Sequence, residues 1–339
     1  MTILITGVAG FIGYNFISYY LTKYPTNKII GIDKLTYAAG NFKNLSQLAI
    51  QHKNYFTFIK GDITDKYFIN SLFKKYNITS IINFAAETHV DRSIKNSSKF
   101  ISTNITGTHI LLDSCKKYWY KNKKWKDNVK FLQISTDEVY GSLETGKFSE
   151  LSLIDPHNPY SASKAAADLI IKSYYQTYNM PILITRSSNN YGPFQISEKL
   201  IPLIIQNALL HKQLPVYGNG KQIRNWLYVD DNCEAIDLVF NTGTFGQIYN
   251  IGGNCEMQNI NLIKLIIKLI NKKTNDPHIT NKLISHVTDR LGHDKRYALD
   301  CTKIKIELGW KPKMKFQDGL IKTINWYIIN QNLKRDIYD

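Results

Sequence analysis

Short apolar segments alternate with longer amphipathic segments through the first half of the chain. The apolar segments span residues 2–6, 28–32, 55–60, 80–84, 129–134 and 182–185. Apolar runs of this length are typical of buried strands, and amphipathic stretches with apolar positions three and four residues apart are typical of helices. Regular alternation of strand and helix predicts an α/β fold built on one parallel sheet.

The pattern changes after residue 187, where the elements become shorter and glycine turns more frequent. A polar turn at residues 188–193 precedes a helix near 199–211, a loop at 214–220 and the segment 224–231. We therefore expect a first domain over residues 1–187. A smaller, interleaved C-terminal lobe that binds substrate should occupy mainly residues 188–339, with some of its segments returning to the sheet.

The first apolar strand leads directly into a glycine-rich turn. Gly7, Gly10 and Gly13 are spaced three residues apart, and an amphipathic helix follows them. Strand, turn and helix N-terminus form a phosphate cradle, because glycine permits close backbone approach and the helix end attracts an anion. This context indicates a Rossmann-type, doubly wound parallel sheet that binds a dinucleotide.

The end of the second strand bears on which dinucleotide is bound. Asp33 lies twenty residues after Gly13, where a carboxylate accepts hydrogen bonds from the adenosine ribose and repels a 2′-phosphate. This favours NAD over NADP as the cofactor. Lys34 follows directly, and its ammonium could instead tolerate the phosphate.

The ends of the third and fourth strands carry further candidate contacts. Asp62 and Ile63 suit the edge and face of an adenine, although Asp62 or Thr64 could simply begin a helix. The pair Ala85-Ala86 is small where the chain must pass close to a dinucleotide. His89 could contact substrate or merely cap a loop.

Five reactive side chains lie in two short blocks. Tyr160 and Lys164 are four residues apart and share one helix face, where the ammonium can stabilise a phenolate. A phenol that works near neutral pH needs a pKa shift of about three units, roughly 4 kcal/mol, which the lysine and a cofactor cation could supply. Asp137 and Glu138, beside Thr136, indicate a site that needs an acid and a base at once. Taken alone, the Tyr and Lys spacing also suits an exposed helix with a structural tyrosine.

Composition places the chain among globular proteins. Its 339 residues are 43% hydrophobic and 21% charged, which suits a substantial core. No apolar run approaches the roughly 20 residues of a membrane span, and the N-terminus begins with a strand rather than a signal peptide. The four cysteines match no zinc or disulfide spacing. We expect a cytoplasmic protein with reduced thiols, no metal site and no membrane partner.

The formal net charge of +16 raises a hypothesis of a different class, a nucleic-acid-binding protein on a degenerate fold of this dinucleotide-binding kind. Much of the local excess lies between residues 116 and 126, where lysines follow a helix. A solvated helix end and loop is the simpler explanation of that cluster. The complete set of reactive residues favours an enzyme without a nucleic-acid partner.

The order of these motifs resembles that of the extended short-chain dehydrogenase/reductase superfamily and, within it, the nucleotide-sugar 4,6-dehydratases. The resemblance covers nearly the whole chain, and its most specific segments are residues 135–141, 198–202, 224–229 and 289–294. Related epimerases and decarboxylases usually lack a carboxylate at the position of Asp137, because their chemistry expels no water. An NAD-dependent nucleotide-sugar epimerase is the alternative within the superfamily.

The resemblance implies a reaction on dTDP-glucose or UDP-glucose in which NAD stays bound and is regenerated. Tyr160 would take the proton of the glucose 4-hydroxyl as hydride leaves C4, with Lys164 lowering the phenol pKa and Thr136 hydrogen-bonded to the C4 oxygen. Glu138 would then remove the C5 proton while protonated Asp137 gives its proton to the leaving C6 hydroxyl. Return of hydride to C6 would yield NDP-4-keto-6-deoxyglucose.

The resemblance also assigns binding residues. The cofactor would contact Gly7, Gly10, Phe11, Ile12, Gly13, Asp33, Lys34, Leu35, Thr36, Asp62, Ile63, Ala85, Ala86, Thr103, Tyr160, Lys164 and Asn190. The nucleotide sugar would contact Thr88, His89, Thr136, Asn189, Lys199, Leu200, Pro215, Val216, Tyr217, Arg224, Asn259, Arg290 and His293. Arginines suit a diphosphate because a guanidinium matches phosphate geometry bidentately. An internal ion pair is the alternative explanation for Arg224 and Arg290.

Three positions depart from the common family pattern. Asn225, Thr88 and Leu291 stand where Asp, Ser and Pro are frequent, which leaves the base, thymine or uracil, open. The downstream deoxysugar, rhamnose or another, is open as well. Because family members generally pair through helices, we expect a homodimer formed by the Tyr160 helix and the helix near Ser98.

Overall fold

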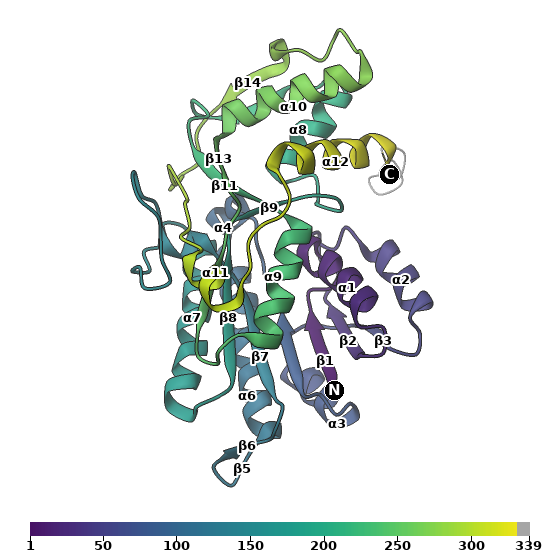
Figure 1. Ribbon diagram of the computed structural model, residues 1–339, viewed down its shortest axis with the longest axis vertical. Helices are drawn as coiled ribbons and strands as arrows, with labels where there is room; N and C mark the ends of the chain where they lie inside the picture. Colours follow the sequence, from purple (N-terminus) through teal and green to yellow (C-terminus); the bar gives the residue numbers. More distant parts are fainter. Residues whose placement is uncertain (331–339) are drawn as a thin grey trace.

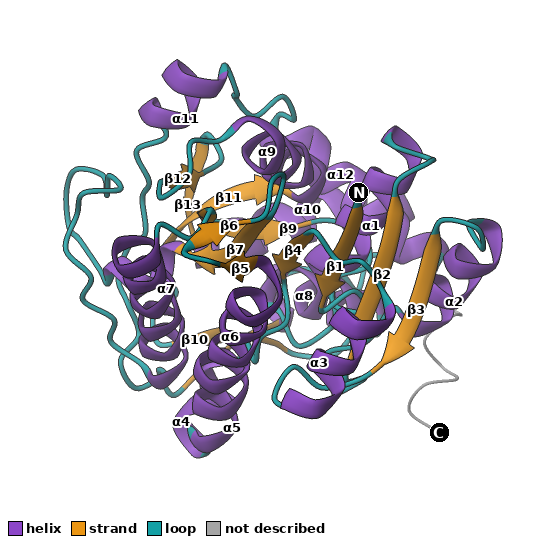
Figure 2. Cartoon of the chain, turned by 90° about the horizontal axis from the view of Figure 1, so that it is seen from below, coloured by secondary structure: helices purple, strands orange, loops and turns teal. Residues whose placement is uncertain are grey.

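The computed structural model describes residues 1–330, and its centre is one seven-stranded parallel sheet. The strands are β1 (Thr2–Thr6), β2 (Lys28–Asp33), β3 (Phe56–Lys60), β4 (Ser80–Asn83), β7 (Lys130–Thr136), β8 (Ile182–Ser187) and β12 (Ile248–Ile251). Their order is β12-β8-β7-β4-β1-β2-β3, so the chain reverses its direction of winding between β1 and β4. Ligands of such sheets bind in the crevice at that reversal. The expected Rossmann-type α/β fold is confirmed (Figure 2).

Helices cover both faces of the sheet (Figures 1 and 2). One face carries α1 (Phe11–Lys23), α2 (Phe42–Gln51) and α9 (Val229–Thr242), and the other carries α3 (Lys66–Lys75), α6 (Thr108–Trp119) and α7 (Pro159–Tyr178). Each strand serves both layers because successive side chains point to opposite faces. In β1, Ile3 and Ile5 join the first core and Leu4 joins the second.

A second lobe stands above the sheet in the view of Figure 1. It contains α8 (Leu200–Leu209), α10 (Asn259–Thr274) and α12 (Phe316–Ile329), a sheet of β13 (Cys255–Gln258), β11 (Ile223–Tyr228) and β9 (Asn189–Tyr191), and the parallel pair β10 (Leu214–Tyr217) and β14 (Ile284–Val287). The remaining helical segments are α4 (Val90–Lys95), α5 (Ser98–Phe100), α11 (Thr302–Leu308), the π-helical turn η1 (Ile101–Gly107), and the 3-10 turns η2 (Asp137–Tyr140) and η3 (Asn281–Leu283). Ile204, Leu262 and Leu320 are fully buried in the core of this lobe.

Segments from the second half of the sequence also contribute to the central sheet. β12 pairs in parallel with β8, and α9 shares a core with α1. The division of the chain at residue 187 stays a prediction, and residues 331–339 of its second part lie outside the described residues.

Three segments that the pattern predicts to be irregular contain short strands. The turn at 188–193 holds β9, the loop at 214–220 holds β10, and the lysine-rich segment after α6 forms a hairpin of β5 (Tyr120–Lys121) and β6 (Lys124–Trp125). These strands are too short or too polar to show an apolar period. The helix expected near Ser98 consists of α5, η1 and α6 in succession.

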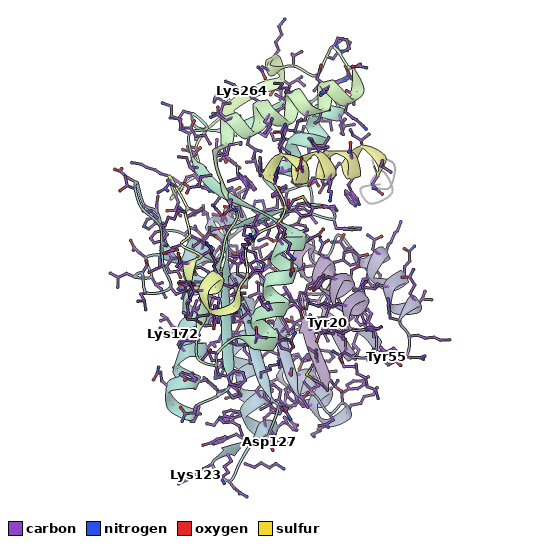
Figure 3. The ribbon with its side chains drawn as sticks, viewed as in Figure 1. Tyr20, Tyr55, Lys123, Asp127, Lys172 and Lys264 are labelled. Carbon is purple, nitrogen blue, oxygen red and sulfur yellow. The ribbon has the colours of Figure 1, made fainter. Side chains whose placement is uncertain are left out.

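Lysine side chains project from widely separated parts of the molecule (Figure 3). Lys123 on the hairpin, Lys172 on α7 and Lys264 on α10 lie in three different regions, so the basic charge is not confined to the hairpin. Within residues 1–330, no helix combines the length and apolar character needed to cross a membrane. The same residues contain no group of His, Cys, Asp and Glu arranged to hold a metal ion.

Candidate active site

A cavity of about 280 Å³ lies at the carboxyl ends of the central strands. All five predicted catalytic residues line it: Thr136, Asp137, Glu138, Tyr160 and Lys164. Its wall also contains the predicted cofactor residues Gly7, Gly10, Phe11, Ile12, Gly13, Asp33, Lys34, Thr36, Asp62, Ile63, Ala85, Ala86, Thr103 and Asn190, and the predicted substrate residues Thr88, Asn189 and Lys199. The fold therefore gathers these separate motifs around one space.

Two glycines shape the turn after β1. Gly7 has a φ of +71°, and a Cβ added there would lie 2.7 Å from the Ala85 nitrogen. A Cβ on Gly13 would lie 2.2 Å from the Gly7 carbonyl oxygen. Only glycine fits at both positions. Phe11 and Ile12, the first residues of α1, line the cavity, as the phosphates of a dinucleotide require.

Asp33 ends β2 and is held by the backbone on two sides. Its Oδ2 accepts a hydrogen bond from the Ala9 amide at 2.9 Å, and its Oδ1 accepts one from the Leu35 amide at 2.7 Å. Each carboxylate oxygen has a second lone pair, so Asp33 remains able to bind a ribose. The side chain of Leu35 does not line the cavity, and its amide positions Asp33 instead.

Lys34 forms a salt bridge of 2.6 Å with Asp62. The ammonium that could have tolerated a 2′-phosphate is therefore already paired, which supports NAD over NADP. Asp62 accepts from the Thr64 amide at 2.9 Å, but α3 is capped by Asp65, which accepts from the Phe68 amide. The alternative in which Asp62 or Thr64 caps this helix is wrong.

The acid pair lies in the single turn η2, directly after β7. The Thr136 hydroxyl starts this turn by accepting a hydrogen bond from the Glu138 amide at 3.3 Å. Asp137 is 1% exposed, and burial, together with the Glu138 carboxylate, raises the pKa of Asp137 to about 8. Burial also raises the pKa of Glu138, but the Arg224 and Lys199 cations oppose that rise. Asp137 therefore keeps its proton at neutral pH, while the cations near Glu138 favour the ionised form of that carboxyl, an arrangement of acid and base.

Lys164 is fixed against the strand that carries the acid pair. It projects from α7, whose first turn is held by a capping box in which the Asn158 side chain accepts from the Ser161 amide at 3.0 Å. The ammonium donates to the Ile134 carbonyl of β7 at 2.7 Å. Burial lowers the pKa of Lys164 to about 8, while the Asp168 carboxylate opposes this effect.

The pKa of the Tyr160 phenol is higher in the folded protein than that of a free phenol. Burial and the Glu138 carboxylate raise its pKa, and a hydrogen bond with the Thr136 hydroxyl lowers it. A positively charged nicotinamide ring is the additional cation that a phenolate needs here near neutral pH.

The two arginines expected at a diphosphate have different partners. Arg224 on β11 lies 4.3 Å over the Tyr297 ring and donates through Nη1 to the Ile223 carbonyl at 2.9 Å. Among the salt bridges formed within residues 1–330, none involves Arg224. Arg290 donates to both oxygens of Asp91, at 2.6 and 3.0 Å. An internal ion pair was the alternative explanation for both arginines, and of the two Arg290 forms one.

The other predicted substrate residues do not line this cavity. They are His89, Leu200, Pro215, Val216, Tyr217, Arg224, Asn259, Arg290 and His293. Burial raises the pKa of Glu138, and the charges of Arg224 and Arg290 act to lower that pKa. These two cations are thus close enough to the acid pair to influence an anion bound beside it.

His89 caps a helix. Its Nδ1 accepts a hydrogen bond from the Arg92 amide at 3.4 Å at the start of α4. Burial, together with the Lys199 charge, lowers the pKa of His89 to about 4. The ring is therefore neutral at physiological pH, and the capping alternative is the one that the structure contains.

Asp91 is the main residue near the site that sequence reasoning missed. Besides Arg290, its carboxylate accepts a hydrogen bond from the Tyr217 hydroxyl at 3.1 Å. The only signal was its position in a polar segment after a buried strand, because its partners are 126 and 199 residues away. Asp91 does not line the cavity, and the lining residues that were not predicted are Ile32, Ala38, Ala39, Gly61, Phe84, Glu87, Ile134, Ser135, Ser187, Ser188, Gln195 and Ile196.

Several buried polar atoms of the cavity wall have no hydrogen-bond partner within the described part of the chain. They are Asp137 Oδ2, Ser188 Oγ, Asn189 Oδ1, Asn190 Oδ1 and Gln195 Oε1. Buried polar atoms are rarely left unpaired in proteins. With the glycine turn and Asp33, they fit a dinucleotide together with a polar second ligand.

A phenol and an ammonium that share one helix face at the end of a dinucleotide-binding crevice define an extended short-chain dehydrogenase/reductase. The chain belongs, more narrowly, to the nucleotide-sugar 4,6-dehydratase family, since the family model described as GDP-mannose 4,6 dehydratase matches residues 4–323.

Individual relatives agree with this family. A dTDP-glucose 4,6-dehydratase from Xanthomonas campestris is 45% identical over 342 residues, covering 100% of this chain and 96% of its own. One from Haemophilus influenzae is 45% identical and covers 98% of this chain and 99% of its own. The crystal structure of dTDP-glucose 4,6-dehydratase from Bacillus anthracis in complex with NAD has a TM-score of 0.87, 45% identity and 99% coverage of both chains. The family indicated by the motifs is confirmed.

Proposed function

We propose that this protein is an NAD-dependent hydro-lyase that converts dTDP-glucose into dTDP-4-keto-6-deoxyglucose and water. The observation that carries the proposal is the buried pair of Asp137 and Glu138 in the same cavity as Tyr160 and Lys164. Oxidation of an alcohol needs a base such as the phenol, whereas loss of a hydroxyl as water also needs a donor that is protonated near neutral pH. The names of the relatives and the NAD in the Bacillus anthracis structure support this substrate and cofactor.

The phenol, the threonine hydroxyl and the ammonium serve the first stage. Tyr160, as phenolate, takes the proton of the glucose 4-hydroxyl, and Thr136 donates a hydrogen bond to the oxygen that becomes a ketone. Lys164 holds positive charge beside the phenolate and hydrogen-bonds the cofactor ribose. NAD, when bound on the glycine turn and Asp33, accepts hydride from C4 and later returns it to C6.

The acid pair serves the second stage. The ketone at C4 acidifies the C5 hydrogen, which Glu138 removes as a proton. Asp137 gives its proton to the C6 hydroxyl, so that the C6–O bond breaks and water leaves. Glu138 returns a proton to C5 when hydride reaches C6, and Asp137 and Tyr160 regain their starting states by proton exchange with solvent.

The pH dependence of turnover follows from two groups with shifted pKa values. Burial and the Glu138 carboxylate raise the pKa of Asp137 to about 8, and burial lowers that of Lys164 to about 8. Both groups must carry their protons, so kcat is expected to fall as the pH rises above about 8. A kcat profile that stays flat through two further pH units, while NAD remains bound, would contradict these roles.

The preference for thymine is supported by relatives rather than by a single pocket residue. Asn225, one of the departures from the family pattern, donates to the Gly253 carbonyl at 2.9 Å and accepts from the Gly253 amide at 2.8 Å. It is therefore occupied with the backbone and is not free to select a base. Thymine and uracil differ by one methyl group, which a pocket distinguishes with one or two contacts.

The test is incubation of the purified protein, without added cofactor, with dTDP-glucose and UDP-glucose in separate reactions. We expect dTDP-glucose to lose the mass of one water and to react faster than UDP-glucose. Faster loss of water from UDP-glucose would show that the preferred base is uracil rather than thymine. An unchanged substrate mass with NAD supplied would overturn the dehydratase proposal.

Two other functions make different predictions in the same assay. An epimerase would return hydride to C4 and give an isomer of unchanged mass. A nucleic-acid-binding protein would bind duplex or single strands with an affinity that falls steeply with salt. The basic residues Lys123, Lys172 and Lys264 lie in separate regions, which favours the enzyme.

We also propose that the protein forms a homodimer through α7 and the helical segment before α6. Leu169 on α7 is 53% exposed and Ile101 in η1 is 51% exposed, so both carry apolar surface that a second copy could cover. Sedimentation of the wild type at micromolar concentration is expected to give a dimer, and Leu169→Lys is expected to weaken it. Leu291→Lys, at an exposed leucine outside these helices, should leave the dimer intact. A monomeric wild type would exclude the proposal.

The proposed division of labour assigns residues 1–187 mainly to NAD and 188–339 mainly to the nucleotide sugar. We further propose a cytoplasmic location, which the four free cysteines support.

A further inference from the structure

A buried ion pair lies on the same helix face as the phenol and the ammonium. Asp168 follows Lys164 by one helical turn, just as Lys164 follows Tyr160. Asp168 is 0% exposed, and its Oδ2 accepts from Arg186 Nε of β8 at 2.9 Å. The same oxygen accepts from the Ser135 hydroxyl of β7 at 2.9 Å. Helix α7 is thereby tied to the two strands that carry the site.

This ion pair is poorly explained as a device for stability. Arg186 is 1% exposed, and burying two charges costs desolvation energy that well-packed apolar residues would avoid. Asp168 Oδ1 and Arg186 Nη2 are both buried without a hydrogen-bond partner in the described chain. A pair kept at that cost, with a carboxylate oxygen unpaired, suggests an electrostatic role.

The groups around Asp168 point to Lys164 as the target of that role. On its own helix, Asp168 shares a face with Lys164 and Tyr160. The strands add two further groups around it, the Arg186 guanidinium of β8 and the Ser135 hydroxyl of β7. Ser135 stands between Ile134, whose carbonyl holds the Lys164 ammonium, and the threonine that starts the acid turn.

Tyr140 closes the far side of the pair. Its ring lies 4.7 Å from the Arg186 guanidinium carbon, and its hydroxyl donates to Asn250 at 2.8 Å. Arg186 thus lies between the Tyr140 ring and Asp168. Its positive charge partly neutralises the carboxylate whose charge acts on Lys164.

We propose that Asp168 is a positioning residue whose negative charge keeps Lys164 protonated in its buried site, and that Arg186 limits that effect by pairing with Asp168. The pair would then set the upper pH limit of the first stage, in which Lys164 supports the phenolate. The inference rests on the proposed function, because Lys164 must support the Tyr160 phenolate. It assigns to the carboxylate the task of opposing the burial that favours a neutral lysine.

The two members of the pair are expected to shift, in opposite directions, the pH profile of single-turnover cofactor reduction, a stage that uses Lys164 but not Asp137. Asp168→Asn removes the anion, so Lys164 loses its proton at lower pH and the alkaline fall in this rate moves down by about one pH unit, a loss of about tenfold above that fall. Arg186→Gln leaves the carboxylate unneutralised, so Lys164 keeps its proton to higher pH and the alkaline fall moves up. General damage to packing would lower the rate in both variants without opposite shifts.

A matched control is Asp237→Asn. Asp237 is a buried carboxylate that is 1% exposed and pairs with Lys23, and neither residue lines the cavity. This variant is expected to lose stability and keep the wild-type pH profile. The proposal would be overturned if, in variants that retain NAD, the alkaline fall in rate moved in the same direction for Asp168→Asn and Arg186→Gln, or did not move in either. If Asp168→Asn does not fold, the direction found for Arg186→Gln decides alone.

The wild type in the same assay separates this inference from the proposed function. Absence of water loss from dTDP-glucose by the wild type would reject the function itself. If the wild type turns over normally and the alkaline fall in rate is not shifted in the variants, only the role of Asp168 would be rejected.

Discussion

Replacing Asp137 by Asn and Glu138 by Gln together is expected to lower the rate of water loss by roughly 10⁴-fold, the upper range for general acid–base catalysis. The two amide side chains would fill the same space as the carboxyl groups, so the cavity should keep its shape. Neither amide can give a proton to the C6 hydroxyl or take one from C5. The expected loss is less than the product of the two single effects, since both act on one elimination step.

The same double variant provides its own control. Tyr160, Thr136 and Lys164 remain, so hydride transfer from C4 should still occur and reduced cofactor should accumulate after substrate is added. The measurement is the absorbance of reduced nicotinamide together with product mass. Product formation near the wild-type rate would remove the acid pair from the mechanism, whatever the state of the cofactor.

Tyr160→Phe is expected to stop the reaction one step earlier and to lower turnover by roughly 10³-fold, because a ring without its hydroxyl cannot accept the 4-hydroxyl proton. No reduced cofactor should accumulate, in contrast to the acid-pair variant. The lost hydroxyl is buried and bonded to Thr136, so a modest change in stability is also expected.

The measurement is single-turnover absorbance of the nicotinamide, with NAD content determined after denaturation. Tyr140→Phe is a matched control, since that phenol is also buried but donates to Asn250 rather than lining the cavity. It should reduce cofactor at a rate near the wild type. Rapid reduction in the Tyr160→Phe variant would show that another group is the base.

The strands of the central sheet and the catalytic blocks could be predicted because their signals are local. Each strand except β12 coincides with a short, mostly apolar segment of the sequence, as expected for the strands of a sheet covered on both faces. The glycine turn, the acid pair and the Tyr-Lys pair each lie within seven residues of sequence. Such short segments fix their own geometry, and the parallel sheet then brings their ends together.

The parts that could not be predicted depend on contacts between distant residues. β9 and β10 are polar or short, and they become strands only because β11 and β14 pair with them. Arg290 is tied to Asp91 across 199 residues, a partner that no spacing reveals. The protonation preferences of Tyr160 and Asp137 arise from burial, which a sequence does not display.

Incubation with dTDP-glucose that carries deuterium at C4 tests the central claim most directly. The proposed mechanism moves that deuterium through bound NAD to C6 of the same sugar. We predict a product that has lost one water and carries deuterium in its C6 methyl group, without any added cofactor. Loss of water with no deuterium at C6, or an unchanged mass with deuterium still at C4, would contradict the account.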